Sequence, residues 1–217
     1  MSEARSSSAR PGLLVSFEGV EGSGKSTQVA RLRGYLESQG RAVEATREPG
    51  GTSIGEAVRE ILLDPRNDAM TGTTELLLYE AARAQHVAQR IRPALEAGRI
   101  VLCDRFADST TAYQGAGRVL APEVVRRLHE VATEGIWPDL TLVVDVPAEV
   151  GLARVTQAGP FDRLEREGLS FHRRVRAGFL RLAQEEPERV KVVDGTRSID
   201  EVAGAIRALV DALLSQR

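Results

Sequence analysis

The sequence Gly19-Val20-Glu21-Gly22-Ser23-Gly24-Lys25-Ser26 matches the phosphate-binding pattern G-x-x-x-x-G-K-[ST] at every constrained position. In that pattern the glycines let backbone N–H groups face an anion, the lysine reaches the outer phosphates, and the hydroxyl can ligate Mg²⁺. An apolar run of strand length, 13–18, precedes the pattern, and residues 25–38 after it have helical spacing. A strand, a glycine loop and a helix N-terminus together predict a nucleoside triphosphate site.

Composition is typical of a single α/β domain. The chain has 217 residues and a net charge of −2, so neither a nucleic-acid partner nor a membrane partner is indicated. The single cysteine, Cys103, excludes an internal disulfide and is expected to be a buried, inert thiol. We expect a flexible N-terminal tail at 1–12, one domain at 13–217, and a cytoplasmic location, because no secretory signal or membrane span is indicated.

Five apolar runs alternate with helical patterns along the chain. The runs lie at 13–18, 42–46, 99–105, 140–146 and 190–193. This alternation predicts an α/β fold of three layers, the P-loop NTPase fold, with a five-stranded parallel sheet and helices on both faces. A long helix is expected over 73–97 with a bend at Pro93, and a capping box at Ser198 and Glu201 should open the last helix.

Polar residues follow the second and third predicted strands. Arg47 to Thr52 read Arg-Glu-Pro-Gly-Gly-Thr, which suits a shaped loop near a ligand as well as an ordinary turn. Asp104 and Arg105 end a buried strand, where a Mg²⁺-directed carboxylate and a phosphate-binding guanidinium are expected in a chain with a phosphate loop. The alternative for Asp104 is a structural ion pair.

Three further segments suit a ligand pocket. Tyr79 and Arg83 share a helix face, although a half-buried tyrosine covered by an arginine would have the same spacing. The stretch 107–118 is dense in hydroxyl and amide side chains. Residues 154–167 are predicted to form a mobile lid that brings arginines in on closing, and the alternative is a solvated connection.

A phosphate loop occurs in switch proteins, motors and kinases, and other sequence motifs distinguish these classes. A guanine-specific switch would need an Asn/Thr-Lys-x-Asp segment, which does not occur here. A motor usually has a longer chain. A kinase of small phosphorylated molecules needs a second pocket with an aromatic, hydroxyls and arginines, and this pattern is present.

Five motifs give the chain a resemblance to the bacterial thymidylate kinase family, and it covers nearly everything from Leu13 to the C-terminal helix. The motifs are Phe17 to Thr27 (FEGVEGSGKST), Thr46 to Thr52 (TREPGGT), Ala81 to His86 (AARAQH), Asp104 to Gly115 (DRF, then DST and AYQG) and Asp162 to Glu165 (DRLE). The resemblance implies transfer of the ATP γ-phosphoryl group to dTMP with Mg²⁺, by a homodimer. The acceptor phosphate is already ionised at neutral pH, since the second pKa of a monoester is about 6. No general base is needed, so the three histidines, His86, His129 and His172, are expected to be structural.

The resemblance also implies a role for each matching residue. The ATP-binding residues would be Gly19, Val20, Glu21, Gly22, Ser23, Gly24, Lys25 and Ser26, with Ser26 and Asp104 on the metal or its water. The residues expected to bind dTMP are Arg47 and Arg105 at the phosphate, Glu21 near the sugar or the phosphoryl site, Tyr79 stacked on the base, Arg83 on a base carbonyl, Thr110 and Gln114 as polar contacts, and Tyr113 against the sugar. The expected catalytic set is Lys25, Arg47, Asp104, Arg105 and Arg163.

This sequence departs from the family's pattern in the placement of positive charge. Family members whose phosphate loop lacks a basic residue, as Glu21-Gly22-Ser23 does here, usually carry extra arginines in the lid. We therefore predict that Arg163, rather than Arg154, closes onto the transferring phosphoryl group. Two alternatives stay open at this point: a kinase of another nucleotide or of a deoxynucleoside, and a P-loop switch that binds nucleotide without phosphorylating a substrate.

Overall fold

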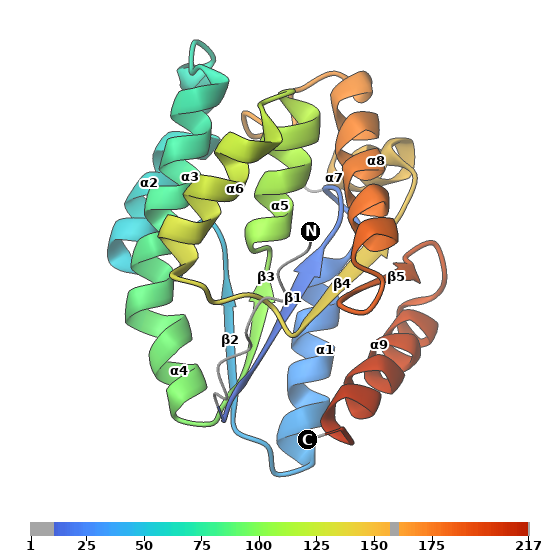
Figure 1. Cartoon of the computed structure of the whole chain (residues 1–217). Coiled ribbons are helices and arrows are strands. Elements are labelled where there is room, and N and C mark those ends of the chain that lie inside the picture. The colour runs from blue at the N-terminus through green and yellow to red at the C-terminus, as the bar shows by residue number, and fades with distance from the viewer. Residues whose placement is uncertain (1–10, 157–160, 217) are drawn as a thin grey trace.

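The computed structural model describes residues 11–156 and 161–216, and its centre is a parallel five-stranded sheet. The strands are β1 (Leu13–Glu18), β2 (Val43–Arg47), β3 (Ile100–Asp104), β4 (Leu140–Asp145) and β5 (Val190–Asp194). Their spatial order is β2-β3-β1-β4-β5 (Figure 1). The predicted fold class, strand number and parallel pairing are confirmed.

The alternation of side chains along β1 builds two cores. Leu13, Val15 and Phe17 pack with α1 (Lys25–Ser38) and α9 (Ile199–Leu214) on one face of the sheet. Leu14 points to the opposite face and packs with residues of β3 and of the helices there. All six residues of β1 are buried and four of them are apolar, as expected of a central parallel strand.

Helices cover both faces of the sheet. Besides α1 and α9, the helices in chain order are α2 (Ser53–Leu63), η1 (Pro65–Asn67), α3 (Gly72–His86), η2 (Val87–Ile91), α4 (Arg92–Glu96), α5 (Ala107–Thr110), η3 (Thr111–Gly117), α6 (Pro122–Thr133), α7 (Ala148–Thr156) and α8 (Leu169–Glu185). In Figure 1, α2, α3 and α6 lie side by side. The predicted capping box at the start of α9 is present, with reciprocal bonds between Ser198 and Glu201.

The helical stretch predicted over 73–97 is divided into three pieces. Between α3 and α4 the turn η2 is a π-helix, and Pro93 lies in the first turn of α4. Proline has no N–H to donate, so a change of hydrogen-bonding pattern just before it is physically reasonable.

Two of the predicted segments lie partly outside the described residues. These are positions 1–10 of the predicted tail and 157–160 of the predicted lid. Gly12, at the end of the predicted tail, already donates to the Leu95 carbonyl at 2.9 Å. Among the described residues, no helix is both long and apolar enough to cross a membrane.

The strand register brings the carboxyl ends of β1, β2 and β3 together at one edge of the sheet. Asp104 at the end of β3 is level with Arg47 on β2 and with Phe17 on β1. The phosphate-binding pattern starts directly after β1. Residues from three distant parts of the sequence therefore meet at the carboxyl edge, where parallel sheets bind ligands.

Candidate active site

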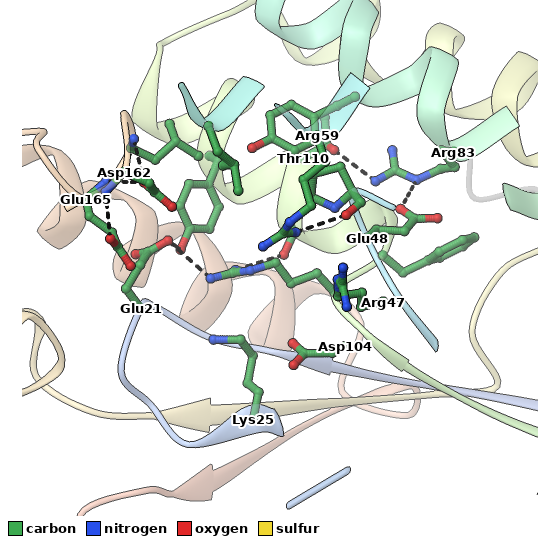
Figure 2. A pocket seen from close by; sticks show the side chains of 18 of the residues that line it. Glu21, Lys25, Arg47, Glu48, Arg59, Arg83, Asp104, Thr110, Asp162 and Glu165 are labelled. Atoms are coloured by element: carbon green, nitrogen blue, oxygen red, sulfur yellow. Dashed lines mark hydrogen bonds and ion pairs between the residues drawn. The ribbon is translucent and has the colours of Figure 1, made fainter. Parts of the chain in front are cut away.

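A pocket of about 280 Å³ opens at this edge, and most of the predicted site residues line it. At the end formed by the phosphate loop they are Glu21, Gly22, Lys25, Ser26, Asp104 and Arg105; along the remaining wall they are Arg47, Tyr79, Arg83, Thr110, Tyr113 and Gln114. In Figure 2, Lys25 and Asp104 lie at one end, and Arg83 and Thr110 lie at the other. Arg163 is the predicted catalytic residue that does not line the pocket.

The phosphate loop has the backbone that its glycines predict. Gly19, Gly22 and Gly24 have φ values of 135°, 66° and 96°, which strain any residue with a Cβ. A Cβ on Gly22 would lie 2.2 Å from the Gly151 carbonyl oxygen of α7, so close packing as well as φ requires glycine there. With the backbone of this chain, a basic side chain at position 22 would require the loop or the Gly151 carbonyl to move.

Lys25 is held inside the loop by carbonyl oxygens. Its Nζ donates to the carbonyls of Gly19 at 3.1 Å and Val20 at 2.8 Å, and to Ser23 Oγ at 3.2 Å. Burial and the Arg105 charge lower the pKa of Lys25 to about 8. An anion in the loop would favour the charged lysine, because opposite charge stabilises the protonated form.

Arg105 joins the phosphate loop to the rest of the pocket. Its Nη1 donates to the Gly19 carbonyl at 3.0 Å and to Ser109 Oγ at 3.2 Å, and the guanidinium lies 4.9 Å from the Tyr113 ring centroid. The backbone has φ 70°, in the left-handed region, and its N–H donates to the Phe17 carbonyl at 2.9 Å. Strained residues of this kind concentrate at functional sites, where surrounding contacts hold them.

Glu21 is a carboxylate enclosed by donors. Its Oε1 accepts from Tyr113 Oη at 2.6 Å and from Arg105 Nη2 at 3.2 Å, while Oε2 lies 3.3 Å from His172 Nδ1. Burial alone would raise its pKa, but His172, Arg105, Lys25 and Tyr113 lower the pKa of Glu21 to about 2. Glu21 is therefore ionised at neutral pH, with its charge at the junction between the loop and Tyr113.

Arg47 and Arg59 add positive charge along the wall. Arg47 is half exposed and bound by the Glu56 carboxylate through two bonds of 2.8 and 3.0 Å. Arg59 donates to the Pro49 carbonyl at 2.9 Å, and burial followed by the Arg47 charge lowers its pKa. Arg59 was not predicted from the sequence, although its position on α2, which directly follows the Arg47 to Thr52 loop, was a signal that could have found it.

The far wall is formed by Arg83 and side chains that bind it. Arg83 is almost fully buried and donates to Glu48, Glu80 and Thr110. The half-buried Tyr79, one helical turn earlier, also lines the pocket. Gln114 donates to Glu75 at 2.7 Å. The prediction that Tyr79 and Arg83 share a helix face is confirmed. The acidic partners, which are Glu48 and Glu80 for Arg83 and Glu75 for Gln114, were not predicted.

Arg163 and Arg154 lie in different surroundings. Arg163 is buried, with its Nη2 2.6 Å from the Glu75 carboxylate and its Nε donating to the Leu62 carbonyl at 2.7 Å. Arg154 instead donates to the Gly22 carbonyl at 3.2 Å, beside the phosphate loop. The predicted contact of Arg163 with the phosphoryl group stays a prediction, and it requires the guanidinium to leave Glu75.

The three histidines lie behind the pocket lining, and each is close to a carboxylate. His86 Nδ1 lies 3.0 Å from Glu48, His129 Nδ1 lies 2.8 Å from Glu80, and His172 faces Glu21. Cys103 is buried, as expected, and burial raises the pKa of its thiol well above the ordinary value. Within the described part of the chain, no cluster of His, Cys, Asp and Glu resembles a ready-made metal site.

Comparison with known proteins agrees with the geometry of the site. A family model described as thymidylate kinase matches residues 17–206. The thymidylate kinase of Geotalea uraniireducens is 50% identical, over 94% of this chain and 99% of the relative. That of Thermomicrobium roseum is 52% identical, over 94% and 96%. The crystal structure of thymidylate kinase from Ehrlichia chaffeensis superposes with a TM-score of 0.75 at 32% identity, covering 92% of this chain and 98% of that one.

Proposed function

The chain belongs to the thymidylate kinase family and phosphorylates dTMP with ATP as the donor, and we propose that the pocket at the carboxyl edge of the sheet binds both substrates. The observation that carries the proposal is the position of Arg105, which bonds the phosphate loop at Gly19 and the acidic side chain of Glu21. A guanidinium there can face phosphates arriving from both directions.

The chemistry required of the protein is positioning and neutralisation of charge. The attacking oxygen of dTMP needs no base, since a phosphate monoester has a second pKa of about 6. Two anionic substrates must be brought into line against their repulsion, which fixed cations achieve. We assign Lys25 and the loop amides to the outer phosphates of ATP, and Arg47 and Arg105 to the phosphate of dTMP.

Mg²⁺ fits one end of the pocket. The Ser26 hydroxyl and the Asp104 carboxylate are hard oxygen ligands, which Mg²⁺ prefers, and they lie together beside the phosphate loop. When bound, the ion would neutralise phosphate oxygens and orient them. Ser26 and Asp104 would hold it directly or through water.

The other end suits a deoxynucleoside. We propose that Tyr79 stacks on the thymine, Arg83 donates to a base carbonyl, and Thr110 and Gln114 supply the remaining polar contacts. Glu21 and Tyr113, joined by the 2.6 Å bond, would face the sugar, with Tyr113 where a ribose hydroxyl would otherwise fit. The predicted lid at about 154–167 and the contact of Arg163 with the phosphoryl group remain predictions.

A panel of acceptors tests the assignment of substrate. ADP production is measured with dTMP, dUMP, other monophosphates and nucleosides at fixed ATP. The highest kcat/KM should be with dTMP, and preference over dUMP should be modest, because one methyl group contributes only about 1–3 kcal/mol. Steady ATP hydrolysis without an acceptor would favour a nucleotide-binding switch, and a nucleoside as the best acceptor would favour the other kinase class.

We also propose that the protein is a homodimer, in a cytoplasmic location as the family suggests. The neighbouring helices α2, α3 and α6 expose large apolar side chains: Ile54, Ile61, Leu77, Val124 and Val131. Exposed apolar side chains gathered over adjacent helices are characteristic of association surfaces. A second copy related by a two-fold axis would cover them.

A further inference from the structure

Arg83 is bound on three sides although it lines a substrate pocket. Its Nε donates to Glu48 Oε2 at 2.8 Å, Nη1 to Glu80 Oε1 at 2.7 Å, and Nη2 to Thr110 Oγ1 at 3.1 Å. A guanidinium has five N–H groups. Within the described part of the chain, two of them have no protein acceptor, and these are the ones available to a ligand.

Glu80 also lies in close contact with His129. His129 belongs to α6 and Glu80 to α3, and His129 Nδ1 lies 2.8 Å from the same Oε1 atom that accepts from Arg83. A carboxylate oxygen can only accept, so this close contact is favourable when Nδ1 carries the proton. The imidazole is 2% exposed; its Nε2 is 3.1 Å from Thr111 Oγ1, and Trp137 contacts its ring edge-on.

The two carboxylates around Arg83 restrain its guanidinium through two ion pairs. In the proposed function, phosphates gather near Lys25 and Arg105, and an unrestrained guanidinium would be attracted to them across a partly desolvated pocket. Glu48 and Glu80 are both almost fully buried, and each holds one nitrogen of the Arg83 guanidinium (Figure 2 shows Glu48 beside Arg83). Buried charge pairs with good geometry are well suited to fixing one orientation.

We propose that Glu80, anchored by His129, is a positioning residue that keeps Arg83 at the base end of the pocket and thereby sets selectivity for a 4-carbonyl over a 4-amino pyrimidine. The two free N–H groups of Arg83 can donate to a carbonyl oxygen and are repelled by an amino group. The inference rests on the proposed role of Arg83. It adds Glu80 and His129, neither of which lines the pocket.

The test compares dTMP with 5-methyl-dCMP, which carries an amino group where dTMP has its C4 carbonyl. The readout is the ratio of the two kcat/KM values. Glu80→Gln should lower this ratio about tenfold, the size expected for a weakened hydrogen bond to a charged group. The change should appear as a higher KM for dTMP, with kcat and the KM for ATP within about twofold, because uniform binding affects KM alone.

Two variants at His129 separate positioning from packing. His129→Leu should also lower the ratio of kcat/KM for dTMP to that for 5-methyl-dCMP. His129→Asn should keep this ratio at the wild-type value, because the amide N–H of asparagine can replace Nδ1–H. The double variant Glu80→Gln with His129→Leu should be no less selective than Glu80→Gln alone, since both act through one contact. Glu130→Gln, the next residue on α6 and part of an exposed pair with Arg126, is the matched control and should change nothing.

The outcomes distinguish the role of Arg83 from its positioning by Glu80. If Arg83→Met leaves the ratio unchanged, the proposed role of Arg83 fails, and the inference fails with it. If Arg83→Met lowers the ratio while Glu80→Gln and His129→Leu lower only the melting temperature, Arg83 keeps its role and the positioning by Glu80 is overturned. Should Glu80→Gln fail to fold, the pair His129→Leu and His129→Asn decides alone.

Discussion

Ser26 Oγ donates a hydrogen bond of 2.5 Å to Asp104 Oδ2, which joins the first turn of α1 to the end of β3 across 78 positions of sequence. The bond closes one end of the pocket. It also brings together the two oxygen ligands proposed for Mg²⁺. A hydroxyl that donates to a carboxylate leaves its own lone pairs available to a cation.

Asp104→Asn should weaken the use of Mg²⁺. Removing the charge of a ligand, or of a residue that orients a metal-bound water, typically lowers metal affinity about 10–100-fold. The half-saturating Mg²⁺ concentration should rise by that factor when initial rates are measured at fixed ATP. Asp68→Asn, at an exposed carboxylate outside the pocket, is the control. An unchanged Mg²⁺ dependence in Asp104→Asn would remove Asp104 from the metal site.

Arg163→Ala should destabilise the protein. The variant leaves the buried Glu75 with Arg118 and Gln114 but without its third partner. Weakening a buried charge network costs about 1–3 kcal/mol, which denaturant unfolding can measure. The same variant tests the predicted contact with the phosphoryl group: kcat lower by about 10³ would support it, and kcat within about twofold would contradict it. Arg166→Ala, an exposed neighbour, is the control.

Glu18 should make stability fall as pH rises. Burial and the Asp108 charge raise the pKa of Glu18 from 4.5 to about 8, although Phe106 N–H and Ser109 Oγ donate to it. Between these two values the folded state keeps a proton that the unfolded chain has released, so stability decreases with pH in that window. Melting temperatures of wild type and Glu18→Gln should therefore diverge from pH 5 to pH 8, with the variant declining less. Parallel curves would be evidence against the protonated Glu18.

Leu77→Asp should shift the protein toward monomers. Leu77 is 50% exposed on α3, at the apolar surface shared with α2 and α6. A charge placed in the centre of a two-fold interface is introduced twice and must be desolvated. Molar mass by light scattering would show the shift. Val192→Asp is matched in exposure, at 45%, but lies on β5 at the far edge of the sheet, and it should keep the mass of wild type. If the wild-type protein has the molar mass of a monomer, the proposed dimer is excluded.

The sequence by itself determined the sheet, the phosphate loop and most of the pocket. Strand and helix periodicities are local properties, so β1 and α1 could be placed from their own residues. The glycines of the loop allow few other backbones. The carboxyl edge of a parallel sheet then brings the ends of β1, β2 and β3 together, and for this reason Asp104 and Arg47 could be predicted as neighbours of the loop.

Only the tertiary structure decided which charges are paired. Arg163 matches a family motif, yet it is bound to Glu75, 88 positions earlier in the sequence, and Arg83 is enclosed by Glu48 and Glu80. Arginine reaches partners on several neighbouring elements, and its choice depends on burial and competing charges, which no local pattern encodes. The sequence therefore predicted where the cations are, and the packing of α2, α3 and α6 around them decided which remain free to meet a phosphate or a base.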